Sequence, residues 1–334
     1  MNVAVILNTT PHVETLLFLY LALDRLEGIK PVAFPLDGDR WGLKALLEKG
    51  KIRYSFHTEG MRDHFDAAVV ITAYPSGIDL PALPFARHPF LKEFSGRRIL
   101  ITHRANAPLS RYESTRVLCL HPAGQNQGVP HLFPCEHPLL GAGMELSPGS
   151  TIRLLVQGKF DRRHRELSLI SAILKQFPQG IHIVLLGSGA SLCGFKDPRV
   201  TTLENLNEVE FYEAAASCHY MLPLVDGTTL KGSYIHERFS SSLGISFADL
   251  KPSIVHESLQ GVYSFPLGHI YRDLTELMEI LQGLTEGAQD YPGMREQMRM
   301  NRDFMRLHNE AVLSDALQEA TSPENPEASV LTEG

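Results

Sequence analysis

The stretch from Ile152 to Gly189 constrains the fold more than any other part of the sequence. An apolar run, Ile152–Val156, stops at Gly158 and is followed by a basic segment. Apolar residues then recur at helical spacing, at Leu167, Ile170, Ile173, Leu174 and Phe177. A second apolar run, Ile181–Leu186, ends in Gly187-Ser188-Gly189. A strand, a turn, a helix and a second strand in this order predict one parallel βαβ crossover.

The basic segment after the first of these strands contains Lys159, Arg162, Arg163 and Arg165. In an open parallel sheet, ligands bind at the carboxyl ends of the strands, where helix N-termini direct free N–H groups towards anions. Cations at a helix N-terminus are unfavourable unless an anion joins them. The segment is therefore either a solvated first turn or a phosphate site, and the charge pattern alone leaves both readings open.

The N-terminal half carries the same alternation. We expect strands at 2–7, 31–35, 67–72 and 98–102, and a helix over 13–26. His12 lies in the loop after the first strand, and His103 directly follows the last of these strands. Both positions face the ligand edge of a parallel sheet, although a lone loop histidine is often idle. Asp37-Gly38-Asp39 is interpreted as a turn rather than as a metal-binding pair, and no metal site is expected.

The C-terminal half continues as an αβ unit. We expect a helix over 208–216 capped by Asn207, a strand over 219–224 and a long loop over 225–237. Serines 240–242 are suited to cap the next helix. Short strands are expected at 253–255 and 262–265, followed by helices over 271–284 and 295–317.

Two αβ units in tandem predict two Rossmann-like αβα domains. Five prolines and five glycines between residues 121 and 150 mark the boundary between them. The predicted domains are 1–140 and 150–286. Helices at 287–320 are expected to cross back to the first domain, and the acidic tail 321–334 is expected to be disordered.

Composition narrows the class of protein. The formal net charge of −7 over 334 residues argues against a protein that coats nucleic acid. Four cysteines without a CxxC pair suit a reducing compartment, so we expect a cytoplasmic protein. Residues 13–23 are interrupted by Glu14 and form neither a signal peptide nor a spanning helix, which leaves peripheral membrane contact at most.

Three segments resemble one enzyme family. Leu222-Pro223-Leu224, Tyr234-x-x-x-Arg238-x-Ser240-Ser241-Ser242 and Lys251-Pro252-Ser253-Ile254 resemble the donor-binding half of GT-B fold glycosyltransferases of the group 1 type. A glycine-ended strand with a basic residue after it, here Gly158 and Lys159, opens the donor domain of that family. The resemblance covers roughly 150–270. It implies an acceptor domain over 1–140, a nucleotide-sugar donor domain over 150–286 and a ligand cleft between the two domains.

The match departs from the family at two positions. Group 1 enzymes commonly carry two glutamates eight positions apart, the second of which contacts the ribose of the donor. Glu237 corresponds to the first, but Ile245 stands in place of the second. Leu250 replaces a glycine of the family pattern. The chain is thus similar to a serine-rich variant, in which the hydroxyls of residues 240–242 and a helix N-terminus would hold the diphosphate.

The resemblance implies the transfer of a sugar from a nucleotide-sugar donor to a glycan, lipid-linked or small-molecule acceptor, without a metal or another cofactor. The implied catalytic residues are His12, His103 and Glu237, with His12 as the base of an inverting reaction. A retaining reaction would need neither histidine, and the stereochemistry stays open. The implied donor-binding residues are Gly158, Lys159, Arg162, Arg163, Lys231, Tyr234, Arg238, Ser240, Ser241 and Ser242.

The sequence also leaves other functions open. A nucleotide-sugar epimerase shares this architecture but requires several carboxylates, of which only Glu237 is evident. The third alternative is a catalytically degenerate protein that acts as a binding or scaffold subunit. The loss of the second glutamate, replaced by Ile245, favours it. A nicotinamide dehydrogenase is disfavoured, because Gly187-x-Gly189 lacks the third glycine of a dinucleotide fingerprint.

Overall fold

In the computed structural model, the described residues are 1–7, 13–35, 42–56, 64–72, 94, 96–103, 116–123, 128–141, 143–147, 149–161 and 163–319. Among these, the side chains of residues 72, 230, 231 and 319 are not described. His12, Arg162, the 37–39 turn and the tail 321–334 lie outside this part of the chain. The description below concerns the described residues.

The first domain is built on a five-stranded parallel sheet with the order β2-β1-β3-β4-β5. Its strands are β1 (Asn2–Leu7), β2 (Lys30–Phe34), β3 (Ala67–Thr72), β4 (Arg97–Thr102) and β5 (Arg116–Cys119), and its helices are α1 (Val13–Asp24) and α2 (Leu43–Lys49). The strands are short apolar runs, as expected where both faces of a parallel sheet are covered. In β1, all residues after Asn2 are buried.

The second domain is built on a six-stranded sheet with the order β11-β10-β9-β6-β7-β8, and its pairs are parallel. Its strands are β6 (Ile152–Gln157), β7 (Ile181–Leu186), β8 (Val200–Leu203), β9 (Tyr220–Met221), β10 (Ser253–His256) and β11 (Gly268–Tyr271). Its α-helices are α5 (Ser168–Gln176), α6 (Glu208–Ala216), α7 (Ser233–His236), α8 (Ser241–Ala248), α9 (Glu257–Gln260) and α10 (Leu274–Thr285), with 3-10 helices η5 (Ala190–Cys193) and η6 (Thr229–Gly232). The predicted crossover from β6 through α5 to β7 is confirmed.

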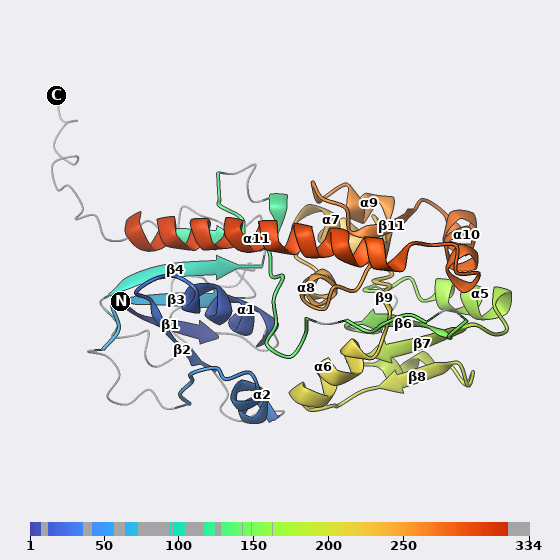
Figure 1. The fold of residues 1–334 in the computed structure, drawn as a ribbon, viewed down its shortest axis with the longest axis horizontal. Coiled ribbons are helices and arrows are strands. Elements are labelled where there is room, and N and C mark those ends of the chain that lie inside the picture. The colour runs from blue at the N-terminus through green and yellow to red at the C-terminus, as the bar shows by residue number, and fades with distance from the viewer. Residues whose placement is uncertain are drawn as a thin grey trace.

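The long helix α11 (Tyr291–Glu319) runs along both domains (Figure 1). It contacts α8 of the second domain and α1 of the first. Near its C-terminal end, Arg25 of the first domain pairs with Glu310 of the helix. The predicted return of the C-terminal helix to the first domain is therefore present.

Phe133 packs the linker against the second domain and α11. It lies in the segment between the sheets, and its ring makes edge contacts with Phe239, Phe247, Tyr263 and Phe265 of the second domain. The side chain of Asn309 in α11 accepts a hydrogen bond from the Phe133 N–H and donates one to its carbonyl, each at 2.9 Å. Since Phe133 and Asn309 are almost fully buried, the linker packs into one core with α8, residues 239 and 263–265 of the second domain and the terminal helix.

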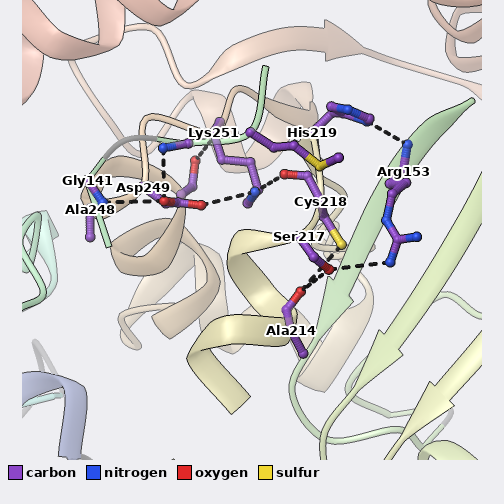
Figure 2. A network of polar contacts seen from close by, with 12 residues as sticks. Gly141, Arg153, Ala214, Ser217, Cys218, His219, Ala248, Asp249 and Lys251 are labelled. Atoms are coloured by element: carbon purple, nitrogen blue, oxygen red, sulfur yellow. Dashed lines mark hydrogen bonds and ion pairs between the residues drawn. The ribbon is translucent and has the colours of Figure 1, made fainter. Parts of the chain in front are cut away.

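A second buried anchor holds the linker where it enters the second domain (Figure 2). One carboxylate oxygen of Asp249 accepts hydrogen bonds from the N–H groups of Gly141 and Gly143. The other lies 3.2 Å from Nζ of Lys251, which also donates to the carbonyl of Cys218. Asp249 and Lys251 are 1% exposed, and breaking such a buried pair leaves an uncompensated charge.

Three predictions about elements of the second domain are wrong. Residues 262–265 are not a strand, because the side chain of Gln260 donates to the carbonyls of Tyr263 and Phe265 and accepts from the N–H of Leu267. The helix expected from Tyr271 begins at Leu274, because Asp273 caps it by accepting from Glu276 N. The loop expected over 225–237 contains the short helices η6 and α7.

Candidate functional site

The turn after β6 is closed by an interlocked pair, Gly158 and Arg165. Gly158 has φ of 128°, and a Cβ atom there would lie 2.3 Å from Nη2 of Arg165. The Arg165 guanidinium is buried and donates to the carbonyls of Gln157 and His164, at 2.6 and 2.8 Å. It also lies 5.7 Å from the ring centroid of Tyr234. Arg165 thus holds the turn together, and glycine is required at 158.

Asp161 organises the basic segment that follows. Its Oδ1 accepts hydrogen bonds from the N–H groups of Arg163 and His164 and from Nδ1 of His164, the last at 2.6 Å. Partial burial opposes ionisation of this carboxyl, but the hydrogen bonds prevail and lower its pKa to about 2. Oδ2 lies 3.7 Å from Nζ of Lys159 and 3.8 Å from Nη2 of Arg163. Both cations remain largely exposed, so an anion from solution can reach them.

The N-terminus of α8 lies beside this turn. Ser242, in the first turn of the helix, donates to Oε1 of Gln157 at 2.8 Å. Ser240 occupies the N-cap position but makes no side-chain capping bond. Its side chain is 2% exposed, and its hydroxyl has no hydrogen-bond partner among the described residues. The expected serine cap is therefore absent, since Ser242 ties the helix to β6 and Ser240 leaves a buried hydroxyl at the helix start.

The segment before α8 is ordered by its own hydrogen bonds. The hydroxyl of Ser233 donates to Oε1 of Glu237 at 3.1 Å, and the Glu237 N–H donates to the Ser233 carbonyl. Glu237 and Arg238 are half-buried. Lys231 belongs to η6, but its side chain lies outside the described part of the chain.

Residues that follow β4 and β5 of the first domain form hydrogen bonds with the segment before α8. The carbonyl of His103 accepts a hydrogen bond from Phe239 N at 3.3 Å. His121 accepts at Nδ1 from Ala123 N, so its Nε2 donates to the carbonyl of Tyr234, at 3.2 Å. Burial lowers the pKa of His121 to about 4, which keeps the ring neutral. Residues 234–239 are thus bound to both domains.

His121 was missed by the sequence reasoning. It follows β5, as His103 follows β4, so the rule that selected His103 applies equally to it. The apolar run Val117–Leu120 ahead of His121 is short and was not recognised as a strand.

The Gly187–Gly189 turn after β7 is not an anion site. The carboxylate of Glu204 accepts hydrogen bonds from Gly189 N, Ser191 N and the Ser191 hydroxyl. A Cβ atom at Gly187 would lie 2.2 Å from the carbonyl oxygen of Gly158. An internal carboxylate therefore occupies the N–H groups that a dinucleotide phosphate would need, which agrees with the missing fingerprint.

The two departures from the group 1 pattern have structural counterparts. Ile245 lies inside α8 and is 3% exposed, so it serves the apolar core at this position. Leu250, where the family has glycine, has φ of 52°. The backbone at this position is therefore left-handed, a conformation that favours glycine over leucine.

The site residues can now be placed. Gly158, Tyr234, Glu237, Arg238 and residues 240–242 come together around the β6 turn and the start of α8, with His103 at the adjoining edge of the first domain. Lys159 and Arg163 lie on the exposed side of that turn. The roles given to His12, Arg162 and Lys231 stay predictions. No helix in the described ranges is long and apolar enough to cross a membrane.

No protein-family model and no curated protein sequence matches the chain. Several solved structures are similar to the chain over nearly its whole length. The Anabaena protein Alr3699/HepE in complex with UDP and glucose is similar with a TM-score of 0.56 at 11% identity, over 95% of this chain and 99% of that one. The lipopolysaccharide outer core galactosyltransferase WaaB gives 0.53 at 11% identity, over 96% and 99%. The UDP-GlcNAc 2-epimerase of Neisseria meningitidis bound to UDP-GlcNAc gives 0.51 at 11% identity, over 96% and 100%.

These identities show a shared fold and nothing finer. The similarity extends over nearly the whole of each chain and includes both domains. In this chain the shared fold consists of two parallel αβ domains in tandem. The chain has the GT-B fold.

Proposed function

We propose that the chain transfers a sugar from a nucleotide-diphosphate sugar to a hydroxyl group of a glycan, lipid-linked or small-molecule acceptor. The observation that carries the proposal is the buried hydroxyl of Ser240 at the start of α8. A buried hydroxyl without a partner costs about 1–3 kcal/mol. A diphosphate oxygen at this helix N-terminus would accept its hydrogen bond and would also interact favourably with the helix dipole.

The leaving group of such a reaction is a nucleoside diphosphate, whose negative charge must be stabilised. Arg163 and Lys159 are exposed beside the Gly158 turn and would move onto the phosphates, with Arg162 and Lys231 as further cations. Ser240, Ser241 and the N-terminus of α8 would hold the other side. This arrangement requires no metal ion, so we propose a metal-independent reaction.

The sugar and the acceptor would meet between the two domains. Glu237, oriented by Ser233, would bind the sugar or the ribose, and Tyr234 and Arg238 would line the donor pocket. An inverting reaction needs a base for the acceptor hydroxyl, for which His12 and then His103 are proposed. The N–H donated by His121 to the Tyr234 carbonyl would hold the donor segment against the first domain.

The fold comparisons support a nucleotide-sugar ligand but divide on the reaction. One similar protein holds UDP and glucose and another is a galactosyltransferase. A third, at nearly the same TM-score, is an epimerase bound to UDP-GlcNAc. Epimerisation is therefore the second proposed function, and it differs from transfer because it consumes no acceptor.

A thermal-shift screen of the purified chain against UDP, GDP, CMP and their sugars, with and without EDTA, tests the proposal. A ligand at 100 times its dissociation constant adds about 2.7 kcal/mol of apparent stability. We expect one nucleotide to stabilise the protein equally with EDTA present. The stabilisation should weaken in Ser240→Ala, Arg163→Ala and Glu237→Ala, and it should persist in Arg299→Ala, an exposed arginine on α11.

The outcomes separate the alternatives. If none of these nucleotides shifts the unfolding temperature, both enzymatic proposals fail and the scaffold interpretation remains. If a sugar nucleotide binds and is converted to its epimer without an added acceptor, transfer is excluded in favour of epimerisation.

A further inference from the structure

The outer face of α11 carries a row of exposed apolar side chains. Met300, Phe304 and Leu307 are 60%, 71% and 63% exposed. Their spacing of four and three residues places them on one side of the helix. The opposite side is buried by Met298, Met305 and Leu313. This α11 stripe, defined by residues 300, 304 and 307, is the densest exposed apolar feature of the described residues, whose other exposed large apolar side chains are Leu192, Ile270 and Leu274.

Charges of alternating sign run along one flank of the α11 stripe. In chain order they are Arg299, Asp303 and Arg306, again at spacings of four and three residues. Within the helix, Arg306 lies 3.7 Å from Asp303, and Arg299 pairs with Glu296. Asp303 and Arg306, of opposite sign and on either side of Phe304, exchange places when the flank is read in reverse. Such a pattern is complementary to a second copy of itself in the antiparallel direction.

We propose that the α11 stripe is a homodimer interface in which two α11 helices pack antiparallel about a two-fold axis at Phe304. In this register the two Phe304 rings meet, and Met300 of one copy lies within one residue of Leu307 in the other. Arg306 comes within one residue of Asp303 of the second copy, and Asp303 within one residue of its Arg306. A two-fold interface is self-complementary in this way.

The charge of the molecule favours a second copy over a lipid surface. The α11 helix contains four arginines and five acidic residues, and the whole chain carries a formal charge of −7. An interfacial helix that binds anionic lipid instead has a strongly basic polar face. The length of α11, which passes along both domains (Figure 1), gives the interface an extended surface. The inference is independent of the proposed function.

The mass of the full chain in solution, measured by sedimentation equilibrium over a series of protein concentrations, tests the dimer. A monomer has a mass of 37.2 kDa, so the dimer has twice that value. Phe304→Glu places two like charges at the two-fold axis and should raise the dissociation constant at least about tenfold. Leu192→Glu, at a side chain 86% exposed on another surface, is the matched control and should leave the dimer intact.

A charge exchange tests the antiparallel register. Asp303→Arg alone brings like charges together and should weaken the dimer, whereas Asp303→Arg combined with Arg306→Asp restores opposite charges and should recover it. Far-UV circular dichroism confirms that each variant is folded. A monomer at all concentrations, a dimer insensitive to Phe304→Glu, or a folded double variant that remains as weak as the single variant would overturn the proposal. So would a monomer that binds anionic vesicles through Phe304.

Discussion

Gly158 and Arg165 depend on each other at the scale of single residues. The guanidinium of Arg165 fills the space in which any larger residue at 158 would carry its Cβ atom. The same guanidinium contacts the ring of Tyr234, so the turn after β6 and the segment before α8 share one support. A change at 158 therefore affects the conformation of the site as well as its stability.

We predict that Gly158→Ala lowers the free energy of unfolding by about 3 kcal/mol, from the left-handed backbone and the steric overlap together. Gly149→Ala is the matched control, because its φ is 76° and a Cβ atom there would meet nothing within 4 Å. That variant should lose only about 1 kcal/mol. Urea denaturation measures both, and equal losses would show that Arg165 does not restrict the position.

Buried histidines make stability depend on pH. Burial lowers the pKa of His131 and of His137 to about 3, from an ordinary value of 6.5. Both rings stay neutral in the folded state, while in the unfolded chain they take up protons below pH 6.5. The contribution of these two rings to the free energy of unfolding is thus complete above pH 6.5. It declines as the pH falls, by about 1.4 kcal/mol per pH unit for each ring.

His137→Asn isolates one of these contributions. The Nδ1 atom of His137 accepts a hydrogen bond from Leu139 N, and an asparagine oxygen can accept in a similar local turn. Between about pH 6.5 and 5, above the main titration of carboxylates, the slope of unfolding free energy against pH should decrease by about 1.4 kcal/mol per unit. An unchanged slope in urea titrations would show that His137 is not held neutral.

The residues of the site were predictable in type but not in role. Sequence reasoning selected residues 240–242 as a group, yet Ser242 bonds Gln157 across the core while Ser240 keeps a buried, unpaired hydroxyl. The different roles of Ser240 and Ser242 depend on how α8 is rotated relative to β6. The spacing of residues in the sequence does not predict this rotation. Arg165 resembles its exposed neighbours in sequence, and only packing distinguishes it as a buried support.

At the scale of elements, the end of α2 shows how local geometry can be tested. Lys51 follows the C-cap Gly50 with φ of 56°, and Ile52 N donates to the carbonyl of Leu47. This is the Schellman arrangement, in which glycine is favoured at the left-handed position.

We predict that Lys51→Gly stabilises the protein by about 0.5–1 kcal/mol, because the left-handed strain exceeds the added entropy of the unfolded glycine. Lys49→Gly, two residues earlier at the last residue of α2, should destabilise it by about 1 kcal/mol. Thermal unfolding measures both variants. Destabilisation by Lys51→Gly would contradict the assigned backbone conformation.

The strands of the two sheets were largely predictable because buried parallel strands are apolar runs. Residues 2–7, 67–72 and 181–186 were expected with the bounds that the structure has. Prediction failed where a side chain decided the outcome. The hydrogen bonds of Gln260 replace a strand at 262–265, and a short run at Arg116–Cys119 forms β5 because a neighbouring strand is present to pair with it.

At the scale of the whole molecule, the linker and α11 hold the two domains together. Asn309→Ala would leave both the N–H and the carbonyl of buried Phe133 without partners, and we predict a loss of about 2–4 kcal/mol. Asn301→Ala, on the same helix, removes only a bond from the Gln297 side chain and should cost about 0.5 kcal/mol. Differential scanning calorimetry compares them, and similar small losses would show that α11 does not anchor the linker.

A nucleotide diphosphate is proposed to bind between the turn after β6 and the start of α8. Hydrogen–deuterium exchange, with and without the nucleotide that stabilises the chain most, tests it directly. We predict slower exchange in peptides covering 157–167 and 239–248, and unchanged exchange in α10, which lies away from the site. Protection that is absent from both peptides, or that appears instead at 187–193, would contradict the claim.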